Sequence, residues 1–286
     1  MSNFKKDIAY WLIPQGFQAP LYNLMEKCHH AFKYSNQEKA LFNKNLALKD
    51  TRKDERCFVL ATGPSIKHQD LKMLQDENCI ALSNFFVHPD YAIINPEYYC
   101  VAPYHPPINE DAWQNWMDEI EKNTGDAKLF FGISDKNRNE THGRFKNRDI
   151  YYLKFGRLWD RNTPRNIDIS RMVPGPQSVS IMALYVALYL GFKKIYLLGC
   201  DHDWLLHINK SVHFYPEKNH SMVRSGYNEW FQEDLEGQFR DYITLWRQYK
   251  EIREIASKNS AQIFNATEGG LLDVFPRVEY EKLFDG

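Results

Sequence analysis

The chain has 286 residues, of which 43% are hydrophobic and 26% are charged, and its formal net charge is −1. This length suffices for one α/β domain with additions, or for two small domains. The balanced charge gives no general reason to bind nucleic acid, and the longest apolar stretch, at 181–190, is too short to cross a bilayer.

The first fifty residues differ from the rest. Aromatic and aliphatic side chains lie among lysines and are interrupted by Pro14 and Pro20. This pattern is typical of an interfacial membrane segment, but a helical arm docked on the rest of the chain would show it too, and we favour the docked arm slightly. We therefore expect an N-terminal helical or amphipathic arm over 1–50 and one domain over 51–286. The polar stretch 35–55 is interpreted as helix or linker.

From residue 56 onward, apolar strand candidates alternate with helical stretches. The predicted strands are 57–61, 79–83, 91–94, 128–132, 150–153, 194–199 and 261–265, and the predicted helices are 66–75, 110–122, 178–190 and 233–258. Such alternation favours an α/β fold with a mainly parallel sheet and helices on both faces.

A small-residue turn follows the first of these strands. The apolar run ends in Ala-Thr-Gly-Pro-Ser at 61–65. A turn without bulk at a strand's carboxyl end lets backbone N–H groups approach a phosphate, although the same pattern serves a turn that only changes direction. The Gly-x-Gly-x-x-Gly and Gly-x-x-x-x-Gly-Lys-Ser/Thr fingerprints are missing, so neither a dinucleotide fold nor a P-loop is predicted.

The segment 178–201 predicts a buried helix and a central strand. Residues 178–190 are apolar nearly all round, Gly191 suits the end of a helix, and Asp201 emerges after the next strand. Ligands of open α/β sheets gather outside the carboxyl ends of the strands. Polar and small residues at or just past predicted strand ends therefore indicate a common site: Gly63, Ser65, Asn84, Asn95, Asp201 and Asn265.

A polar segment rich in His and Tyr, at about 202–232, is predicted to be a lid over this site. It follows the pair Asp201 and Asp203, which resembles the Asp-x-Asp of glycosyltransferases that bridge a diphosphate through Mg²⁺ or Mn²⁺. Asp201 would equally satisfy backbone N–H groups at the strand end, and we favour that interpretation.

The five cysteines are scattered, with no Cys-x-x-Cys, and are expected to be free buried thiols. Since no signal peptide is recognised, we expect a cytoplasmic protein, with peripheral contact between the arm and the inner face of the membrane left open.

These motifs, in their order and spacing, resemble those of the bacterial CMP-sialic acid-dependent sialyltransferases of glycosyltransferase family 42, and of the wider superfamily that includes the motility-accessory-factor proteins. The family's Gly-Asn-Gly-Pro-Ser is similar to 61–65, its Asn-x-Phe to Asn84-Phe-Phe, and its Asn-Pro to Asn95-Pro. Its Ser, apolar helix and Ile-Tyr-Leu-x-Gly-x-Asp are similar to 178–201. The resemblance covers residues 56–100 and 175–275.

The resemblance implies a Rossmann-like domain of the GT-A-variant sialyltransferase type that binds a CMP-activated sugar under a lid. It implies an inverting transfer of a sialic acid-like (nonulosonic) sugar to a glycan or lipid-linked acceptor of a bacterial lipopolysaccharide or capsule, with no required cofactor. The implied catalytic candidates are His220 as general base, His213 as the second choice, and Asp201. The expected nucleotide- and donor-binding residues are Thr62, Gly63, Ser65, Asn84, Asn95, Ser178, Gly199, Asp203 and Tyr215.

The chain departs from the family's pattern at two of these positions. Thr62 stands where the family has Asn, and Asp203 where it has a Tyr that steadies the departing phosphate. A carboxylate there would repel a phosphate unless it were protonated or bridged by a cation. The alternatives are a Mg²⁺-dependent diphosphokinase of the hydroxymethylpterin type, another nucleotide-sugar transferase using Asp201 and Asp203 with a metal, or a nucleotide-sensing scaffold protein without turnover.

Overall fold

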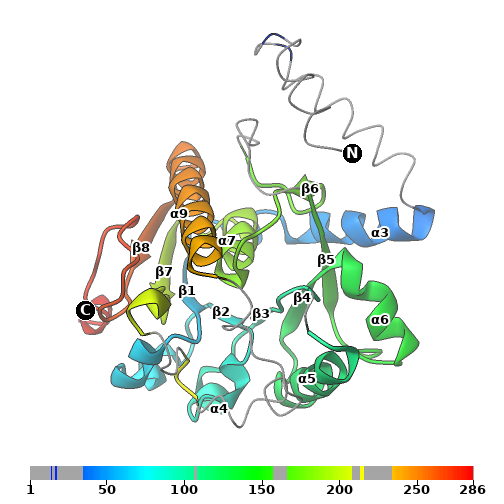
Figure 1. Cartoon of the computed structure of the whole chain (residues 1–286), viewed down its shortest axis with the longest axis horizontal. Coiled ribbons are helices and arrows are strands. Elements are labelled where there is room, and N and C mark those ends of the chain that lie inside the picture. The colour runs from blue at the N-terminus through cyan, green and yellow to red at the C-terminus, as the bar shows by residue number, and fades with distance from the viewer. Residues whose placement is uncertain are drawn as a thin grey trace.

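In the computed structural model, eight parallel strands form one sheet in the order β6-β5-β4-β3-β2-β1-β7-β8 (Figure 1). The structure describes residues 14, 17, 35–105, 108–156, 166–207, 213–215 and 234–285. The strands are β1 Arg56–Leu60, β2 Cys79–Leu82, β3 Tyr98–Cys100, β4 Lys128–Gly132, β5 Ile150–Phe155, β6 Met172–Val173, β7 Lys194–Leu198 and β8 Gln262–Asn265. The predicted α/β, Rossmann-like fold class is confirmed.

Helices cover both faces of the sheet (Figure 1). The α-helices are α3 Asn36–Lys44, α4 Tyr91–Ile94, α5 Glu110–Asn123, α6 Lys136–Thr141, α7 Val179–Leu190 and α9 Leu235–Lys258. Helices α7 and α9 contribute to the hydrophobic core on one face, and α5 contributes to the core on the other. Short 3₁₀ helices span Asn45–Leu48, Pro64–His68, Leu71–Leu74, Phe85–Val87, Ile133–Asp135, Trp204–Leu206 and Glu281–Leu283.

Helix α7 lies where the sequence predicts it. The Ser178 side chain accepts a hydrogen bond from Ser180 N at its start, and Gly191 ends it in the left-handed region with φ 96°. A helix without a polar face has to be buried on every side, and α7 packs between the sheet and α9. Its packing fixes the amino end of α7 at the edge where the strands end.

Two predicted elements are wrong. Residues 91–94, predicted as a strand from their aromatic and β-branched side chains, form the single turn of α4, which Asn95 closes with φ 45°. The strand is β3, three residues further on. The predicted helix 66–75 is two 3₁₀ helices, because Asp70 interrupts it and its side chain accepts a hydrogen bond from Lys72 N at the start of the second.

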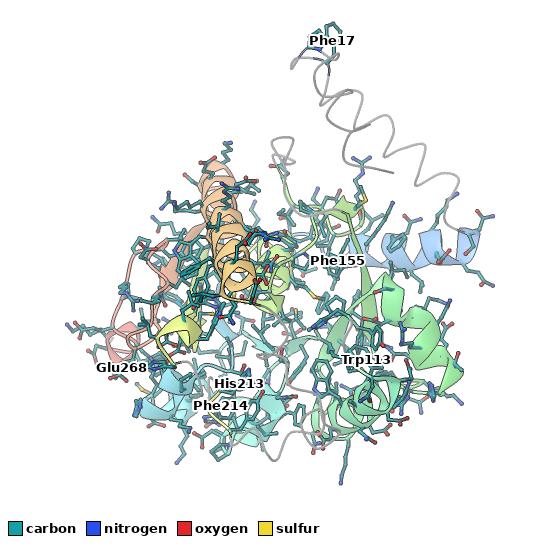
Figure 2. The ribbon with its side chains drawn as sticks, in the orientation of Figure 1. Phe17, Trp113, Phe155, His213, Phe214 and Glu268 are labelled. Carbon is teal, nitrogen blue, oxygen red and sulfur yellow. The ribbon has the colours of Figure 1, made fainter. Side chains whose placement is uncertain are left out.

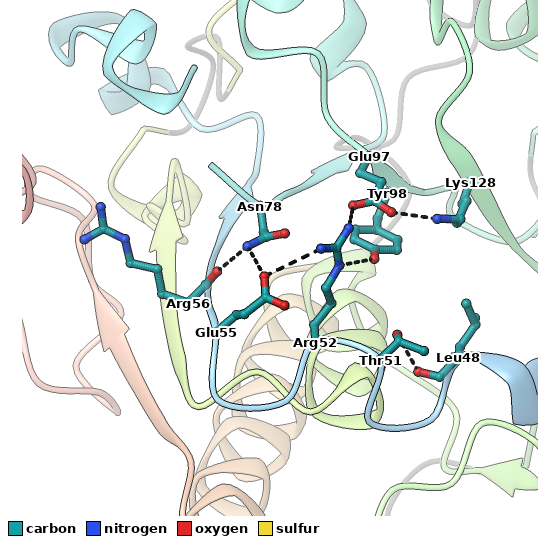
Figure 3. Close-up of polar contacts among 9 residues, drawn as sticks. All are labelled: Leu48, Thr51, Arg52, Glu55, Arg56, Asn78, Glu97, Tyr98 and Lys128. Atoms are coloured by element: carbon teal, nitrogen blue, oxygen red, sulfur yellow. Dashed lines mark hydrogen bonds and ion pairs between the residues drawn. The ribbon is translucent and has the colours of Figure 1, made fainter. Parts of the chain in front are cut away.

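The opposite, amino edge of the sheet is tied together by a polar network around Arg52 (Figure 3). Arg52 Nε donates to the Tyr98 hydroxyl at 3.0 Å, and its guanidinium pairs with Glu97. Glu97 also pairs with Lys128 Nζ at 2.6 Å. The segment before β1 is thereby attached to β3 and β4, although ion pairs this exposed stabilise a fold only modestly.

Residues 36–48, assigned to an arm or linker in the sequence, pack against β5. Phe42 is buried, and buried Asn45 Nδ2 donates to the carbonyls of Tyr152 at 2.9 Å and Ile169 at 2.7 Å. The predicted boundary at residue 50 therefore does not separate this part of the chain from the domain. Of residues 1–34 of the predicted arm, only Pro14 and Phe17 are described.

Within the described ranges, no helix combines the length and the apolar character that a bilayer crossing needs.

A buried carboxyl group lies just past the end of β4. Asp135 is fully buried, and its Oδ1 accepts from Tyr104 N at 3.1 Å. Its Oδ2 has no hydrogen-bond partner among the described residues. Burial raises the pKa of Asp135 to about 6 from 3.8, because water no longer solvates the charged form.

We expect Asp135→Asn to change how stability depends on pH. Since the native pKa is raised, ionisation opposes folding, so this group's contribution is favourable below about pH 4 and is lost as the pH rises through 6. The free energy of unfolding of the natural chain minus that of the variant should therefore fall by roughly 2–3 kcal/mol between pH 4 and pH 7. Urea unfolding over this pH range measures it.

Ile169→Val is the control for this experiment, because it removes one methyl group from a fully buried position and introduces no titrating group. It should cost about 1 kcal/mol at every pH. A difference for Asp135→Asn that stays constant with pH would contradict the expectation.

Candidate functional site

The site lies where the strand order reverses. The chain runs outward from β1 through β2 to β6 and then returns to β7, which pairs with the other side of β1. Leu60 and Leu198 are register partners, so the turns that follow β1 and β7 begin side by side. Ligands of open α/β sheets bind at this kind of switch point, outside the carboxyl ends of the strands.

The two turns touch through their backbones at Gly63. Gly63 N donates to the Gly199 carbonyl at 2.9 Å. A Cβ atom added at Gly63 would lie 2.4 Å from that carbonyl oxygen and 1.8 Å from Asp201 Oδ2. Because Gly63 has an ordinary φ of −62°, the constraint is lack of space and not conformation. The turn after β1 therefore needs glycine here.

Asp201 holds the first turn in place. Its carboxylate accepts from Ser65 N at 3.2 Å and from Ser65 Oγ at 2.8 Å. It is nearly buried, and burial raises its pKa to about 6. Its backbone carbonyl accepts from Leu271 N at 2.8 Å, which closes the turn after β8 over the same edge. These bonds agree with the interpretation that Asp201 satisfies backbone N–H groups.

Residues 213–215, from the predicted lid, lie across the ends of β1 and β2. Phe214 N donates to the Thr62 carbonyl at 2.9 Å, and the Phe214 ring is buried. Asn84 Nδ2 donates to the Tyr215 hydroxyl at 3.0 Å. The His213 ring stacks on Tyr215 with centroids 5.0 Å apart. Figure 2 shows His213 beside Phe214 on the lower side of the molecule, between Glu268 and Trp113.

Asn84 has a partner at each end of its amide. In addition to the bond to Tyr215, its Oδ1 accepts from Trp116 Nε1 at 2.5 Å. Asn84 is buried, with 2% of its surface exposed. It connects Trp116 of α5 to Tyr215 at the end of β2.

A line of side-chain hydrogen bonds connects the turn after β7 with the start of α7. His202 Nε2 lies 2.7 Å from the Tyr249 hydroxyl, which lies 2.6 Å from Ser180 Oγ. Ser180 Oγ lies 2.7 Å from Ser178 Oγ. Burial lowers the pKa of His202 to about 4, so its ring is neutral near pH 7.

Asp203 and His207 form a separate pair, with Asp203 Oδ2 3.1 Å from His207 Nε2. Within the described part of the chain, no group of three or more His, Cys, Asp or Glu side chains is arranged to hold a metal ion. Both oxygens of Asp201 already accept hydrogen bonds from Ser65, so a cation bridging Asp201 and Asp203 would compete with those bonds.

Most of the residues predicted for the site do meet at this edge. They are Thr62, Gly63, Ser65, Asn84, Ser178, Gly199, Asp201, Asp203, His213 and Tyr215. Asn95 is an exception, because it is exposed and precedes β3, at the amino side of the sheet. The prediction that Asn95 lies past a strand end is wrong. The geometric reason to expect a nucleotide contact at Asn95 is therefore lost. His220 lies outside the described residues.

Sequence reasoning missed His202, Trp116 and Tyr249. His202 stands between two aspartates that drew the metal interpretation, and its φ of 46°, rare for a non-glycine residue, cannot be inferred from sequence. Trp116 and Tyr249 lie on amphipathic helices, where an aromatic residue is expected to be core. A single sequence does not distinguish an aromatic residue that only packs in the core from one whose polar atom also forms a hydrogen bond in the site.

We expect Gly63→Ala to destabilise the chain by about 1–3 kcal/mol, because the new methyl group displaces either the Gly199 carbonyl or the Asp201 carboxylate. Chemical unfolding measures the loss. Gly156→Ala is the matched control, since the three atoms nearest to its Cβ would all belong to the flexible Met172 side chain, at 3.2–3.3 Å. Equal stabilities of the two variants would show that the contact between the turns is not tight.

In sequence comparisons, no protein-family model matches this chain, and neither does any curated protein.

Proposed function

We propose that this chain is a glycosyltransferase that transfers a sialic acid-like sugar from a CMP-activated donor to a glycan or lipid-linked acceptor. The observation that carries the proposal is that the turns after β1 and β7, with 2.9 Å between Gly63 N and Gly199 O, meet at the switch point on the edge where α7 begins. It supports a phosphate-bearing ligand, because ligands of open α/β sheets bind at such a point and a helix start favours negative charge. The choice of CMP and of the sugar rests on the resemblance in sequence.

The amino end of α7 supplies the electrostatic part of the proposal. A twelve-residue helix carries partial positive charge at its start, and Ser178 stands at that start with a hydroxyl group. The phosphate of CMP would bind between this helix end and the turn at 62–65. Hydrogen bonds to a charged oxygen are each stronger than those between neutral groups.

The acidic side chains beside this position are already partnered. Asp201 receives two hydrogen bonds from Ser65, and Asp203 lies against His207. At the position where the chain departs from the family, the Asp203 carboxylate therefore already has a partner within the protein.

The chemistry we propose needs a base and a stabilised leaving group. The acceptor hydroxyl oxygen forms the new bond to the anomeric carbon as the bond from that carbon to the CMP phosphate oxygen breaks. The hydroxyl proton passes to a histidine, and CMP departs with the bonding electrons. His213 is the base we favour, because it stacks on Tyr215 at the sheet edge; His220 is the second candidate.

The nucleotide preference tests the proposal. We expect CMP at a hundred times its Kd to raise the melting temperature by about 5 °C, and UDP, GDP and ATP to raise it less, with or without Mg²⁺. Ser178→Ala should weaken CMP binding about tenfold, as expected for one lost hydrogen bond to a charged oxygen. Isothermal titration calorimetry measures the affinity.

Ser170→Ala is the matched control, because Ser170 bonds to Asp168 before β6, on the amino side of the sheet. It should bind CMP like the natural chain. A preference for ATP that depends on Mg²⁺ would favour the diphosphokinase instead, and no nucleotide binding would refute the proposal.

Turnover tests the base. We expect His213→Ala to lower the rate of CMP release from CMP-sialic acid in the presence of acceptor by about 10²–10⁴-fold, while CMP affinity is unchanged. His142→Ala, an exposed histidine at the end of α6, is the control and should keep full activity. If His213→Ala and His220→Ala both keep near-full turnover, neither histidine is the base.

A further inference from the structure

In the line of hydrogen bonds from His202 to Ser178, the direction in which one group donates limits the direction in which the next can donate. It contains three contacts: His202 Nε2 to Tyr249 at 2.7 Å, Tyr249 to Ser180 at 2.6 Å, and Ser180 to Ser178 at 2.7 Å. Each contact needs one hydrogen, and each hydroxyl has only one to give. If Tyr249 donates to His202, the direction of the whole line is therefore fixed, because Tyr249 must then accept from Ser180 and Ser180 from Ser178.

Two arrangements matter for Ser178. In the first, His202 Nε2 carries a hydrogen and donates to Tyr249, Tyr249 donates to Ser180, and Ser180 donates to Ser178. In the second, Nε2 is bare, and every bond must run in the opposite direction and begin with the Ser178 hydrogen. The Nε2–H tautomer is therefore necessary for Ser178 to keep its hydrogen for a ligand, because a bare Nε2 always consumes it.

Ser178 Oγ also accepts from the backbone N–H of Ser180 at 3.2 Å. In the first arrangement both of its lone pairs are used and its hydrogen is free, so Ser178 can only donate to a ligand. In the second its hydrogen is used and one lone pair is left, so it can only accept. A phosphate oxygen at the start of α7 requires the first arrangement.

The surroundings of the ring favour the same arrangement. Among the described residues, none forms a hydrogen bond with Nδ1, whereas Nε2 has the Tyr249 contact. A hydrogen on Nδ1 would have no hydrogen-bond partner among the described residues. With the hydrogen on Nε2, the only N–H of the ring is used.

The ring is also held firmly in this orientation. Trp204, Trp246 and Tyr249 lie around it, with ring centroids 5.5, 6.1 and 5.5 Å away. The His202 carbonyl accepts from the Tyr242 hydroxyl at 2.9 Å. With φ at 46°, the backbone adopts a sparsely populated conformation that persists only where its surroundings impose it.

We infer that His202 is a positioning residue: as the neutral Nε2–H tautomer it leaves the hydroxyls of Tyr249, Ser180 and Ser178 free to donate in turn, so that Ser178 presents a hydrogen to an anionic oxygen at the start of α7. The inference deepens the proposed function and rests on it for the identity of that anion. The tautomer itself is independent of any ligand.

The tautomer is measured on the ligand-free protein. In the full chain labelled with ¹⁵N-histidine, long-range ¹H–¹⁵N correlation spectra distinguish Nε2–H from Nδ1–H rings, and His202→Gln identifies the His202 signals by their loss. We expect the Nε2–H pattern at pH 7. In Tyr249→Phe, which removes one hydroxyl, we expect the His202 nitrogen shifts to move toward the average of both tautomers. An Nδ1–H pattern in the natural chain would overturn the inference.

The effect at Ser178 is measured by CMP affinity. His202→Leu should weaken CMP binding about tenfold, whereas His202→Gln, whose side-chain amide can donate from the same place as Nε2, should bind within about threefold of the natural chain. Equal affinity of His202→Leu and the natural chain would overturn the inference, and so would equal losses in both variants. If CMP binds no form of the protein, the proposed function fails, whereas an Nε2–H pattern would still support the assigned tautomer.

Discussion

The parallel pairing of β1 with β7 is the constraint on which the site depends. The two strands are far apart in sequence, yet their register from Arg56 opposite Lys194 to Leu60 opposite Leu198 is unbroken. It brings Ser65 within hydrogen-bond distance of Asp201 and leaves no room for a side chain at Gly63. Buried α7 enforces the pairing, because it packs on β1, β2 and β3 and leads directly into β7.

The parts of the fold that sequence predicts are those in which local pattern and burial agree. Helix α7 is apolar on all sides and ends at a glycine with positive φ, so its length and its place in the core follow from composition alone. Residues 91–94 show the opposite case. Their side chains suit a strand, but the three residues of β3 that do pair, Tyr98–Cys100, are set by their neighbours β2 and β4. Tertiary pairing overrides local preference in so short a segment.

The candidate site divides in the same way. Turn residues such as Gly63 and Ser65 could be predicted because they directly follow an apolar strand in the sequence. The carboxyl ends of parallel strands lie at one edge of the sheet, so residues that follow them come together. The prediction for Asn95 was wrong because it inherited the misplaced strand. Tyr249 could not be found, since its ring belongs to the core while its hydroxyl joins His202 to Ser180. One residue then has two roles, and a hydrophobic pattern reports only the first.

The charged groups at this edge of the sheet belong to two segments, the turn after β7 and the start of α7. The carboxylates of Asp201 and Asp203 have partners within the protein, Ser65 and His207. The amino end of α7 lies at the same edge, where the helix dipole is positive and the Ser178 hydroxyl is hydrogen-bonded to Ser180. Two segments that look acidic and apolar in sequence thus meet at one edge, and the anion site that we propose lies at the helix start. What makes the combination possible is that α9 carries Tyr249 between them, with its ring in the core and its hydroxyl within reach of both.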